Sequence, residues 1–279
     1  GFNSVQSLRI PLDAMPVSRL IEIHNTCGFV PIPALDYYLL SNCLRKHPKL
    51  VDGVDIEGNT LLDFYEAEKR ASHYNDLFEA LTCDERMLKI LNIWRDQVRL
   101  IMGKHEYAKP VITSGATTTC ATGNVPLLRF KESECTASLK KVLPAFQSQW
   151  DVPWDKLSEN TALGTVAPKT YKVGRMVFSP ACANALVQRS DGLTLRERLR
   201  VEGIDLRNAQ DIHKRLASFA SIRNHLTTDD QKWASPLIYK SLVRFLVSDE
   251  WYYHLDAARD DVVRLPDGSE VKLAQFATQ

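Results

Sequence analysis

The strongest structural constraint in this sequence is a long amphipathic helix that we expect between residues 84 and 102. Its apolar side chains recur at steps of three or four, the spacing of one helix face: Met87, Leu91, Trp94, Val98 and Ile101. Asp84 can cap the first turn and Gly103 can end the last. We interpret the stripe as the buried side of a core helix, so the chain has to supply a globular body around it.

Helical and strand patterns are mixed along the rest of the chain. Apolar spacing and capping residues predict further helices at 36–47, 61–80, 194–202, 209–219 and 235–247. β-type residues around turn signals predict hairpins at 164–179 and 262–273, and a strand at 225–229. Residues 112–124 are small and polar, as in a linker. The sequence therefore predicts an α+β fold.

Composition favours a globular protein without a membrane span. Hydrophobic residues make up 44% of the 279 residues, and no run of about 18 apolar residues appears. The chain begins at Gly1 without a basic and apolar leader, so we expect an N-terminus that is processed, tagged or incomplete. Six scattered cysteines form no C-x-x-C pair, and we expect them to be reduced and mostly buried.

Charge is segregated along the chain, although the formal net charge is only +1. Residues 165–200 carry seven bases and two acids, a net charge of +5. Residues 51–90 carry ten acids and four bases. A nucleic-acid contact would therefore come from the basic stretch rather than from the chain as a whole.

Three bases lie on the hairpin expected at 164–179. Lys169, Lys172 and Arg175 are spaced so that their charged groups could converge on one triphosphate. A solvated basic loop is the alternative, and the residues alone do not decide between the two.

Three arginines, Arg196, Arg198 and Arg200, alternate with Glu197 on the helix expected at 194–202. They could follow an RNA backbone, because phosphate contacts give affinity without sequence choice. A surface helix with local ion pairs explains the same pattern.

Two adjacent acids, Asp229 and Asp230, end the expected strand and precede a helix. Carboxylates at such a position can hold a divalent cation, and phosphoryl and nucleotidyl transfer need such ions. Solvated turn residues or helix caps are the alternative.

Read in order, these segments resemble the replicase catalytic subunit of the leviviruses, the small RNA bacteriophages. The most specific stretch is similar to the family's basic finger motif, V-x-P-K-x-x-K-x-x-R, at Val166, Pro168, Lys169, Lys172 and Arg175. Further stretches in register are Ser114–Thr119, Arg196–Leu199, Gly203–Leu206 and Leu265–Ser269. Leu226, Thr228, Asp230, Ala234 and Ser235 look like the first palm motif.

The resemblance implies a right-hand RNA-directed RNA polymerase. Asp230, rather than Asp229, would be the first metal-binding carboxylate of the catalytic site. It would bind Mg²⁺, or alternatively Mn²⁺, with Asp229 beside it as a second candidate ligand. Lys169, Lys172 and Arg175 would neutralise the triphosphate of the entering NTP. We expect an N-terminal helical region at 1–110, fingers at 111–224 and the start of the palm at 225–279. Because the later Asp pair of the family is not here, the palm would be incomplete, and we expect the isolated chain to be inactive.

The resemblance also implies partners and a location. These are an RNA template and NTPs, the host elongation factors Tu and Ts, a ribosomal protein, and the cytoplasm of the bacterial host, with no membrane. The chain departs from the family at Lys232 and Trp233, at Ser179, and at Pro236, where the family has a second Asp. The alternative function is a non-catalytic RNA-binding or interaction protein derived from the polymerase fingers.

Overall fold

A computed structural model describes the chain from residue 53 to residue 276 with several gaps. The gaps fall at 113–114, 121–132, 153, 155–156, 171, 224–233 and 236, and residues 221–223 are described by their backbone alone. Contacts between Cα atoms divide the chain into two compact units, residues 1–64 with 166–176 and residues 65–165 with 177–279. The domain boundaries expected from the sequence stay predictions.

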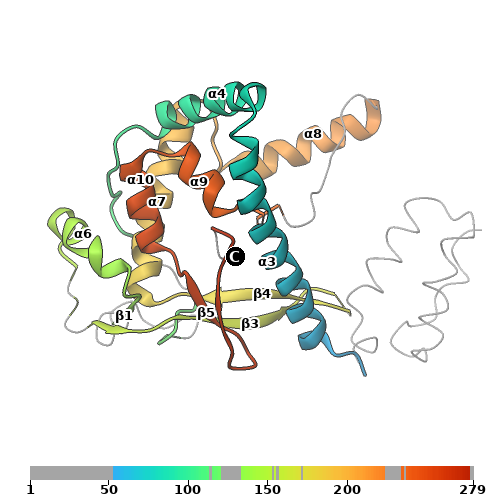
Figure 1. Ribbon diagram of the computed structural model, residues 1–279, viewed down its shortest axis with the longest axis vertical. Helices are drawn as coiled ribbons and strands as arrows, with labels where there is room; N and C mark the ends of the chain where they lie inside the picture. Colours follow the sequence, from blue (N-terminus) through green and yellow to red (C-terminus); the bar gives the residue numbers. More distant parts are fainter. Residues whose placement is uncertain are drawn as a thin grey trace, which may run out of the picture. The chain divides into compact units, whose positions relative to one another are not determined.

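The described residues form both helices and strands. The helices are α3 (Ile56–Leu81), α4 (Glu85–Met102), the short 3-10 helix η4 (Leu139–Lys141), α6 (Leu143–Gln149), α7 (Cys182–Val201), α8 (Ala209–Arg223), α9 (Lys240–Leu246) and α10 (Asp249–Ala258) (Figure 1). The strands are β1 (Ser133–Cys135), β2 (Leu157–Glu159), β3 (Ala162–Pro168), β4 (Gly174–Ser179), β5 (Val262–Arg264) and β6 (Glu270–Lys272). The mixed α and β class expected from the sequence is confirmed. No helix in this described part is long and apolar enough to cross a bilayer.

Both hairpins expected from the sequence are present in one four-stranded sheet. The strand order is β4-β3-β5-β6. β5 and β6 are antiparallel, with Val263 opposite Val271. Gly268 takes a φ of 84° in their turn, a conformation open to glycine because it has no Cβ. β3 runs parallel to β5, with Ala162 opposite Val263, although these strands lie far apart in the sequence. β1 and β2 form a separate parallel pair.

Helix α7 runs through the core of the unit formed by 65–165 and 177–279. Its apolar side packs into a cluster of buried residues that includes Leu139, Phe146 and Ala257. α10 lies along α7, and α4 packs against the C-terminal part of α7 (Figure 1). The expected start at Thr194 is wrong, because α7 begins at Cys182. The composition of a turn is present at residues 190–192, Ser-Asp-Gly. In the structure, however, the side chains of Ser190 and Asp191 are buried and hydrogen-bonded to the segment 105–108 that follows α4.

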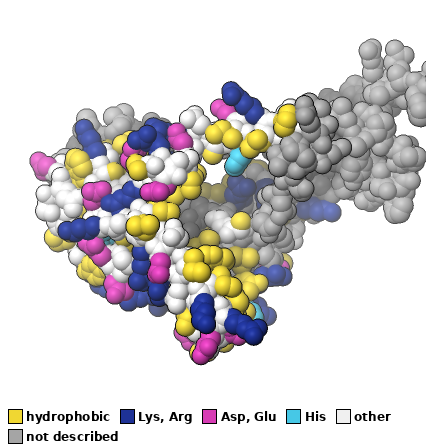
Figure 2. All heavy atoms as spheres, turned by 90° about the horizontal axis from the view of Figure 1, so that it is seen from above, with side chains coloured by type: hydrophobic (Ala, Val, Ile, Leu, Met, Phe, Trp, Pro, Cys, Tyr) yellow, Lys and Arg dark blue, Asp and Glu magenta, His cyan; other side chains and the backbone are white. Residues whose placement is uncertain are grey.

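Helix α4 begins and ends where the sequence predicts. The Asp84 side chain accepts hydrogen bonds from the backbone N–H groups of Arg86 and Met87, and Gly103 ends the helix at a φ of 53°. The expectation that its whole stripe is buried is wrong, since Leu91 is buried but the Trp94 side chain is 58% exposed. α4 packs on α9 and α7 along one side only. Figure 2 looks onto the molecule from the side where α4 lies, and hydrophobic side chains gather on that surface.

The expectations for the other helices and for the cysteines have mixed outcomes. α3 and α8 contain the helices expected at 61–80 and 209–219. α9 begins at Lys240 rather than at residue 235, and α10, which Ser248 caps, was not expected. Cys120, Cys135 and Cys182 are free and buried, while Cys83 is free and exposed. The expected helix at 36–47, the strand at 225–229, Cys27 and Cys43 lie outside the described residues.

Asn184 is a fully buried polar residue that connects α7 to two other segments. Its side-chain oxygen accepts a hydrogen bond from the Thr136 backbone at 2.9 Å. Its amide nitrogen donates to Thr136 Oγ1 and to the Ala258 carbonyl, each at 2.9 Å. Because buried polar groups are stable only when paired, these bonds fix α7 against the chain before η4 and the end of α10.

We predict that Asn184→Ala destabilises the protein by about 3 kcal/mol, since it leaves the buried Thr136 N–H unpaired and opens a cavity. Urea unfolding followed by circular dichroism measures this. Gln97→Ala, which shortens an exposed amide on α4, is the control and should change stability by less than about 0.5 kcal/mol. Equal effects of the two substitutions would contradict the role given to Asn184.

Asp260 is a fully buried carboxyl at the junction between α10 and β5. Gln188 Nε2 lies 3.4 Å from its Oδ2, and its Oδ1 has no hydrogen-bond partner among the described residues. Burial raises the pKa of Asp260 to about 7, Asp261 adds to the rise, and Gln188 and Arg259 oppose it. The folded protein therefore holds a proton that the unfolded chain releases at lower pH.

The consequence is a loss of stability as the pH rises. The protonated Asp260 side chain stabilises the folded state fully at pH values below 3.8, the ordinary pKa of an aspartate. This stabilisation is lost as the pH rises to about 7, the pKa of Asp260 in the folded protein. We predict that Asp260→Asn removes this loss, so that the variant gains stability over the parent at pH 8 but not at pH 4. The gain is on the order of 4 kcal/mol at most. Urea unfolding at both pH values tests this, with the exposed Asp76→Asn as control, and equal gains at both would contradict it.

Candidate nucleotide and nucleic-acid site

The turn between β3 and β4, in the unit formed by 1–64 and 166–176, is held by its own hydrogen bonds. The Thr170 backbone N–H donates to the Val173 carbonyl at 3.0 Å. Thr170 Oγ1 accepts from the backbone N–H groups of Lys172 and Val173, at 3.3 and 3.2 Å. A threonine that bonds to nearby backbone groups in this way stabilises a turn. The geometry of the turn is therefore set locally by one side chain.

The first turns of α3 hold the same turn from outside. Asn59 Nδ2 donates to the Lys172 carbonyl at 3.0 Å, and the Gly174 N–H donates to Thr60 Oγ1 at 2.8 Å. A Cβ on Gly174 would lie 2.4 Å from Val166 Cγ1 and 2.9 Å from the Ala167 carbonyl oxygen. Only glycine fits there without a shift of the backbone. Sequence reasoning missed Asn59 and Thr60, which lie more than a hundred residues away in the chain.

The three bases of the basic turn, Lys169, Lys172 and Arg175, all have exposed side chains. Arg175 lies between the buried residues Gly174 and Met176, so the alternation of β4 directs it to the exposed face. The turn thus presents three positive charges on a backbone held by α3. That arrangement suits a polyanion, because charge-assisted hydrogen bonds to phosphate are about twice as strong as neutral ones.

The two acids expected to bind metal, Asp229 and Asp230, lie outside the described residues. Among the residues that are described, no three His, Cys, Asp or Glu side chains gather into a group that could hold a metal ion. The metal role of Asp230 and Asp229 stays a prediction.

The three arginines near the end of α7 have different surroundings. Arg198 Nη2 donates to the Lys104 carbonyl at 2.6 Å and to Glu106 at 2.9 Å, and its guanidinium lies 5.5 Å from the centre of the Trp251 ring. Arg200 pairs with Glu197 on the surface, and Arg196 is exposed. Residues two apart on a helix do not face the same side. The structure therefore does not bring the three together as one row.

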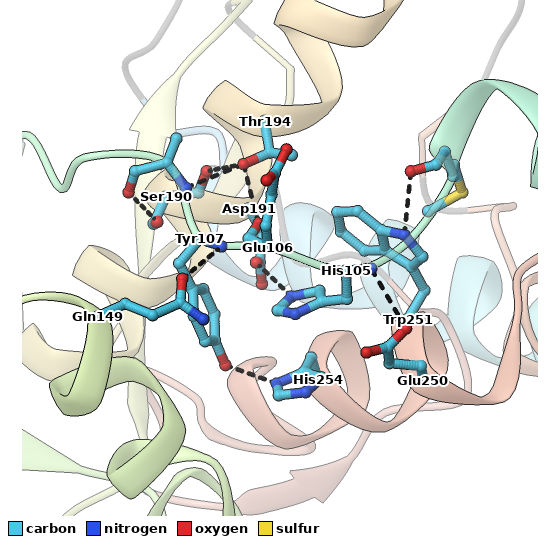
Figure 3. A network of polar contacts seen from close by, with 12 residues as sticks. His105, Glu106, Tyr107, Gln149, Ser190, Asp191, Thr194, Glu250, Trp251 and His254 are labelled. Atoms are coloured by element: carbon cyan, nitrogen blue, oxygen red, sulfur yellow. Dashed lines mark hydrogen bonds and ion pairs between the residues drawn. The ribbon is translucent and has the colours of Figure 1, made fainter.

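A buried polar network, which sequence reasoning missed, connects the chain after α4 to α7 and α10. His105 Nε2 lies 3.0 Å from Asp191 Oδ1, and the His105 ring stacks on that of His254 with centroids 3.8 Å apart (Figure 3). The Tyr107 hydroxyl lies 2.6 Å from His254 Nδ1. Burial and the neighbouring His105 lower the pKa of His254 to about 4. Burial raises the pKa of Asp191, and the hydrogen bond from His105 opposes the rise.

This network stabilises the fold rather than forming a catalytic site. The side chains of His105 and Asp191 are 3% and 1% exposed, so a substrate has no access to them. Around them, Thr194 Oγ1 donates to the Glu106 carbonyl at 3.0 Å, and Trp251 Nε1 donates to the Gly103 carbonyl at 2.9 Å. The described residues thus place the basic turn, and not the His–Asp pair, where it can meet a ligand.

Comparison with known proteins agrees with the motifs. A family model described as RNA replicase, beta-chain, matches residues 33–279. The chain is 28% identical over 282 residues to the RNA-directed RNA polymerase subunit beta of Enterobacteria phage SP. The aligned region covers 92% of this chain and 49% of the phage SP protein. It is 34% identical over 146 residues to the subunit beta of Escherichia virus Qbeta, covering 52% of this chain and 24% of the relative.

A further relative is the RNA-directed RNA polymerase beta chain of Escherichia phage MS2. It is 34% identical over 111 residues, which cover 40% of this chain and 20% of the relative. The chain spans about half the length of the phage SP protein and a smaller share of the other two. The resemblance drawn from the sequence motifs is thereby confirmed, and the chain belongs to the RNA replicase beta-chain family of the RNA bacteriophages.

Proposed function

We propose that this chain takes part in template-directed RNA synthesis, in which NMP is transferred from an NTP to an RNA 3′ end as a phage genome is copied in the bacterial host cell. The observation that carries the proposal is the exposed basic turn, fixed from inside by Thr170 and from outside by Asn59 and Thr60. The family supports the reaction, and the fixed turn supports a role in gripping the nucleotide. The right-hand arrangement of fingers and palm belongs to the same proposal.

The basic turn would act through charge. Phosphoryl and nucleotidyl transfer need little covalent chemistry from the protein, so positioning and charge neutralisation provide most of the rate enhancement. Lys169, Lys172 and Arg175 would hold the triphosphate of the entering NTP and stabilise negative charge as the leaving group departs. A backbone fixed in advance helps, because its cations need no reorganisation when the ligand arrives.

Asp230, with Asp229 beside it, would hold Mg²⁺, or Mn²⁺ in its place. Adjacent carboxylates are the hard oxygen donors that these ions prefer. The bound ions would orient the triphosphate and stabilise the attacking and leaving oxygens. One pair of adjacent acids does not complete a two-metal site, so further ligands would have to come from other residues.

The host partners in the proposal come from the family resemblance alone. The host elongation factors Tu and Ts and a ribosomal protein would assemble with the replicase. The acidic segment at 51–90 is a candidate contact, and it includes α3, whose exposed side is rich in acids. A solvated helix face accounts for the same acids.

To test the nucleotide grip, we predict that replacing Lys169, Lys172 and Arg175 together by alanine weakens binding of a fluorescent GTP analogue by at least about tenfold. The loss of even one charge-assisted hydrogen bond is expected to have that effect. Fluorescence anisotropy measures it. A triple Arg86, Lys89 and Lys214→Ala variant removes three exposed positive charges elsewhere and should bind almost normally.

Template-directed incorporation of labelled nucleotide, by a replicase that contains this chain, extends the test to the reaction. The basic-turn variant should raise the KM for NTP, while the control variant should not. Unchanged GTP binding in the basic-turn variant, or an equal loss in both variants, would overturn the assignment.

For RNA contact, we propose that Arg196 and Arg200 face the RNA backbone and that Arg198 serves the fold. The contacts of Arg198 with Lys104, Glu106 and Trp251 engage its guanidinium within the protein. The pair of Arg200 with Glu197 is exposed, and such pairs contribute little, so a phosphate can replace it.

We predict that Arg198→Ala lowers the melting temperature, because it removes a hydrogen-bonded and stacked side chain, while Arg196→Ala with Arg200→Ala leaves it unchanged. The double variant should instead reduce the salt dependence of single-stranded RNA binding, by a slope of about 0.7 for each phosphate that the protein no longer neutralises. Thermal denaturation and RNA titrations at several salt concentrations distinguish the two roles. An RNA slope that falls only in Arg198→Ala would contradict the division.

A further inference from the structure

The basic turn is tied to the first turns of α3 at two points, both within the unit formed by 1–64 and 166–176. Asn59 Nδ2 donates to the Lys172 carbonyl, and Thr60 Oγ1 accepts from the Gly174 N–H. We call Asn59 and Thr60 together the α3 clamp. One hydrogen bond would leave the turn free to rotate about it, whereas two bonds at different residues fix its orientation.

The start of α3 that carries the clamp is itself held in place. Asp55 Oδ1 accepts a hydrogen bond from the Gly58 N–H at 2.8 Å, in the manner of a helix cap. Thr60 is 2% exposed, and its hydroxyl donates its single proton to the Ile56 carbonyl at 2.6 Å. Toward the basic turn, Oγ1 of Thr60 can therefore only accept. The clamp is a preformed acceptor beside a preformed donor.

The bonds within the turn and the bonds to α3 have different effects. Thr170 bonds only to the neighbouring residues Lys172 and Val173, so its bonds set the shape of the turn and would move with it. The clamp bonds end on a helix outside the turn. They therefore determine where the turn points, which the internal bonds do not.

The three cations differ in what places them. Lys169 directly follows the last residue of β3, and Arg175 lies within β4, so a strand determines where each of these side chains begins. Lys172 lies between the two strands, and its own carbonyl is the group that Asn59 holds. Of the three, Lys172 is thus the one whose starting point depends on the clamp.

We propose that the α3 clamp is a positioning device for the entering nucleotide: it directs Lys172 toward the triphosphate, while Lys169 reaches the ligand without it. A cation that is already in place needs less ordering when the ligand binds, so its contact contributes more to affinity. The inference rests on the proposed role of the basic turn in gripping NTP.

Paired substitutions separate the two clamp bonds from their surroundings. Asn59→Ala removes the donor to Lys172, and Asn59→Gln returns an amide on a longer stem. Thr60→Val removes the acceptor for the Gly174 N–H with little change of shape, and Thr60→Ser keeps that acceptor. Gln97→Ala is the control, because it removes an exposed side-chain amide from another helix.

Amide hydrogen exchange shows whether the clamp holds the turn. Asn59→Ala and Thr60→Val should speed exchange in peptides that cover residues 170–176. Thr60→Ser and Gln97→Ala should leave that exchange as in the parent, and Asn59→Gln should lie between Asn59→Ala and the parent. Equal exchange in all the variants would overturn the inference, since α3 would then hold nothing.

The decisive measurement is the affinity for the fluorescent GTP analogue in a double-mutant cycle. Asn59→Ala alone should weaken binding by about fivefold, the effect of one ordinary hydrogen bond. In a Lys169→Ala background, the same substitution should again weaken binding by about fivefold. In a Lys172→Ala background it should change affinity by less than about twofold, because the cation that the clamp directs is gone.

This pattern distinguishes positioning from a general effect on the fold. A purely structural loss would lower affinity by the same factor in both backgrounds, and that result would overturn the inference. Rescue of affinity in Thr60→Ser but not in Thr60→Val is the matching expectation at the second bond. Parent-like affinity in Thr60→Val would contradict it.

The outcomes also separate the inference from the proposed function. If Lys172→Ala binds the GTP analogue like the parent, the grip fails at this residue and the positioning role falls with it. If Lys172→Ala weakens binding but Asn59→Ala and Thr60→Val do not, the positioning role fails while the grip stands. Should Asn59→Ala not fold, the pair Thr60→Val and Thr60→Ser decides, and equal affinity of these two would overturn the inference.

Discussion

The fold of the larger unit depends on the polar side chains that α7 places in the core. Helix α7 is buried on the side that carries Asn184, Ser190, Asp191 and Thr194. A buried polar group without a partner destabilises the folded state, so each of these residues requires a particular backbone segment beside it. Asn184 binds the chain before η4 and the end of α10, and the other three bind the chain that follows α4. Apolar packing alone would allow the same elements to slide; these bonds select one arrangement.

The described structure separates two uses of positive charge that look alike in the sequence. Lys169, Lys172 and Arg175 lie on a turn whose backbone is satisfied by Thr170, Asn59 and Thr60, and their side chains are exposed. Arg198 Nη2 is bonded to carbonyl and carboxylate groups of its own chain, and the guanidinium lies over the Trp251 indole. A cation whose hydrogen bonds are already made inside the protein has little left for a phosphate.

Local features were predictable from the sequence, while those that depend on distant contacts were not. The caps of α4 at Asp84 and Gly103, and the hairpins formed by β3–β4 and β5–β6, follow from residues within a few positions of each other. The extent of α7 could not be predicted, because Ser190 and Asp191 favour a turn until Ala108 and His105 satisfy them. The exposed Trp94 was missed for the same reason, since periodicity shows that a helix has an apolar side but not what covers it. The basic turn was found by its charges, whereas Asn59 and Thr60, which hold it, carry no local signal.

The parallel pairing of β3 with β5 has a consequence for how the protein is made. Ala162 pairs with Val263, so roughly a hundred residues must be synthesised after β3 before its partner exists. At translation rates of about 5–20 residues per second, that wait lasts about 5–20 s. Hairpins form in microseconds, so β3 and β4 can pair long before the sheet is complete. The edge of β3 that later meets β5 is meanwhile open on the ribosome, and the nascent chain has to avoid aggregating through it.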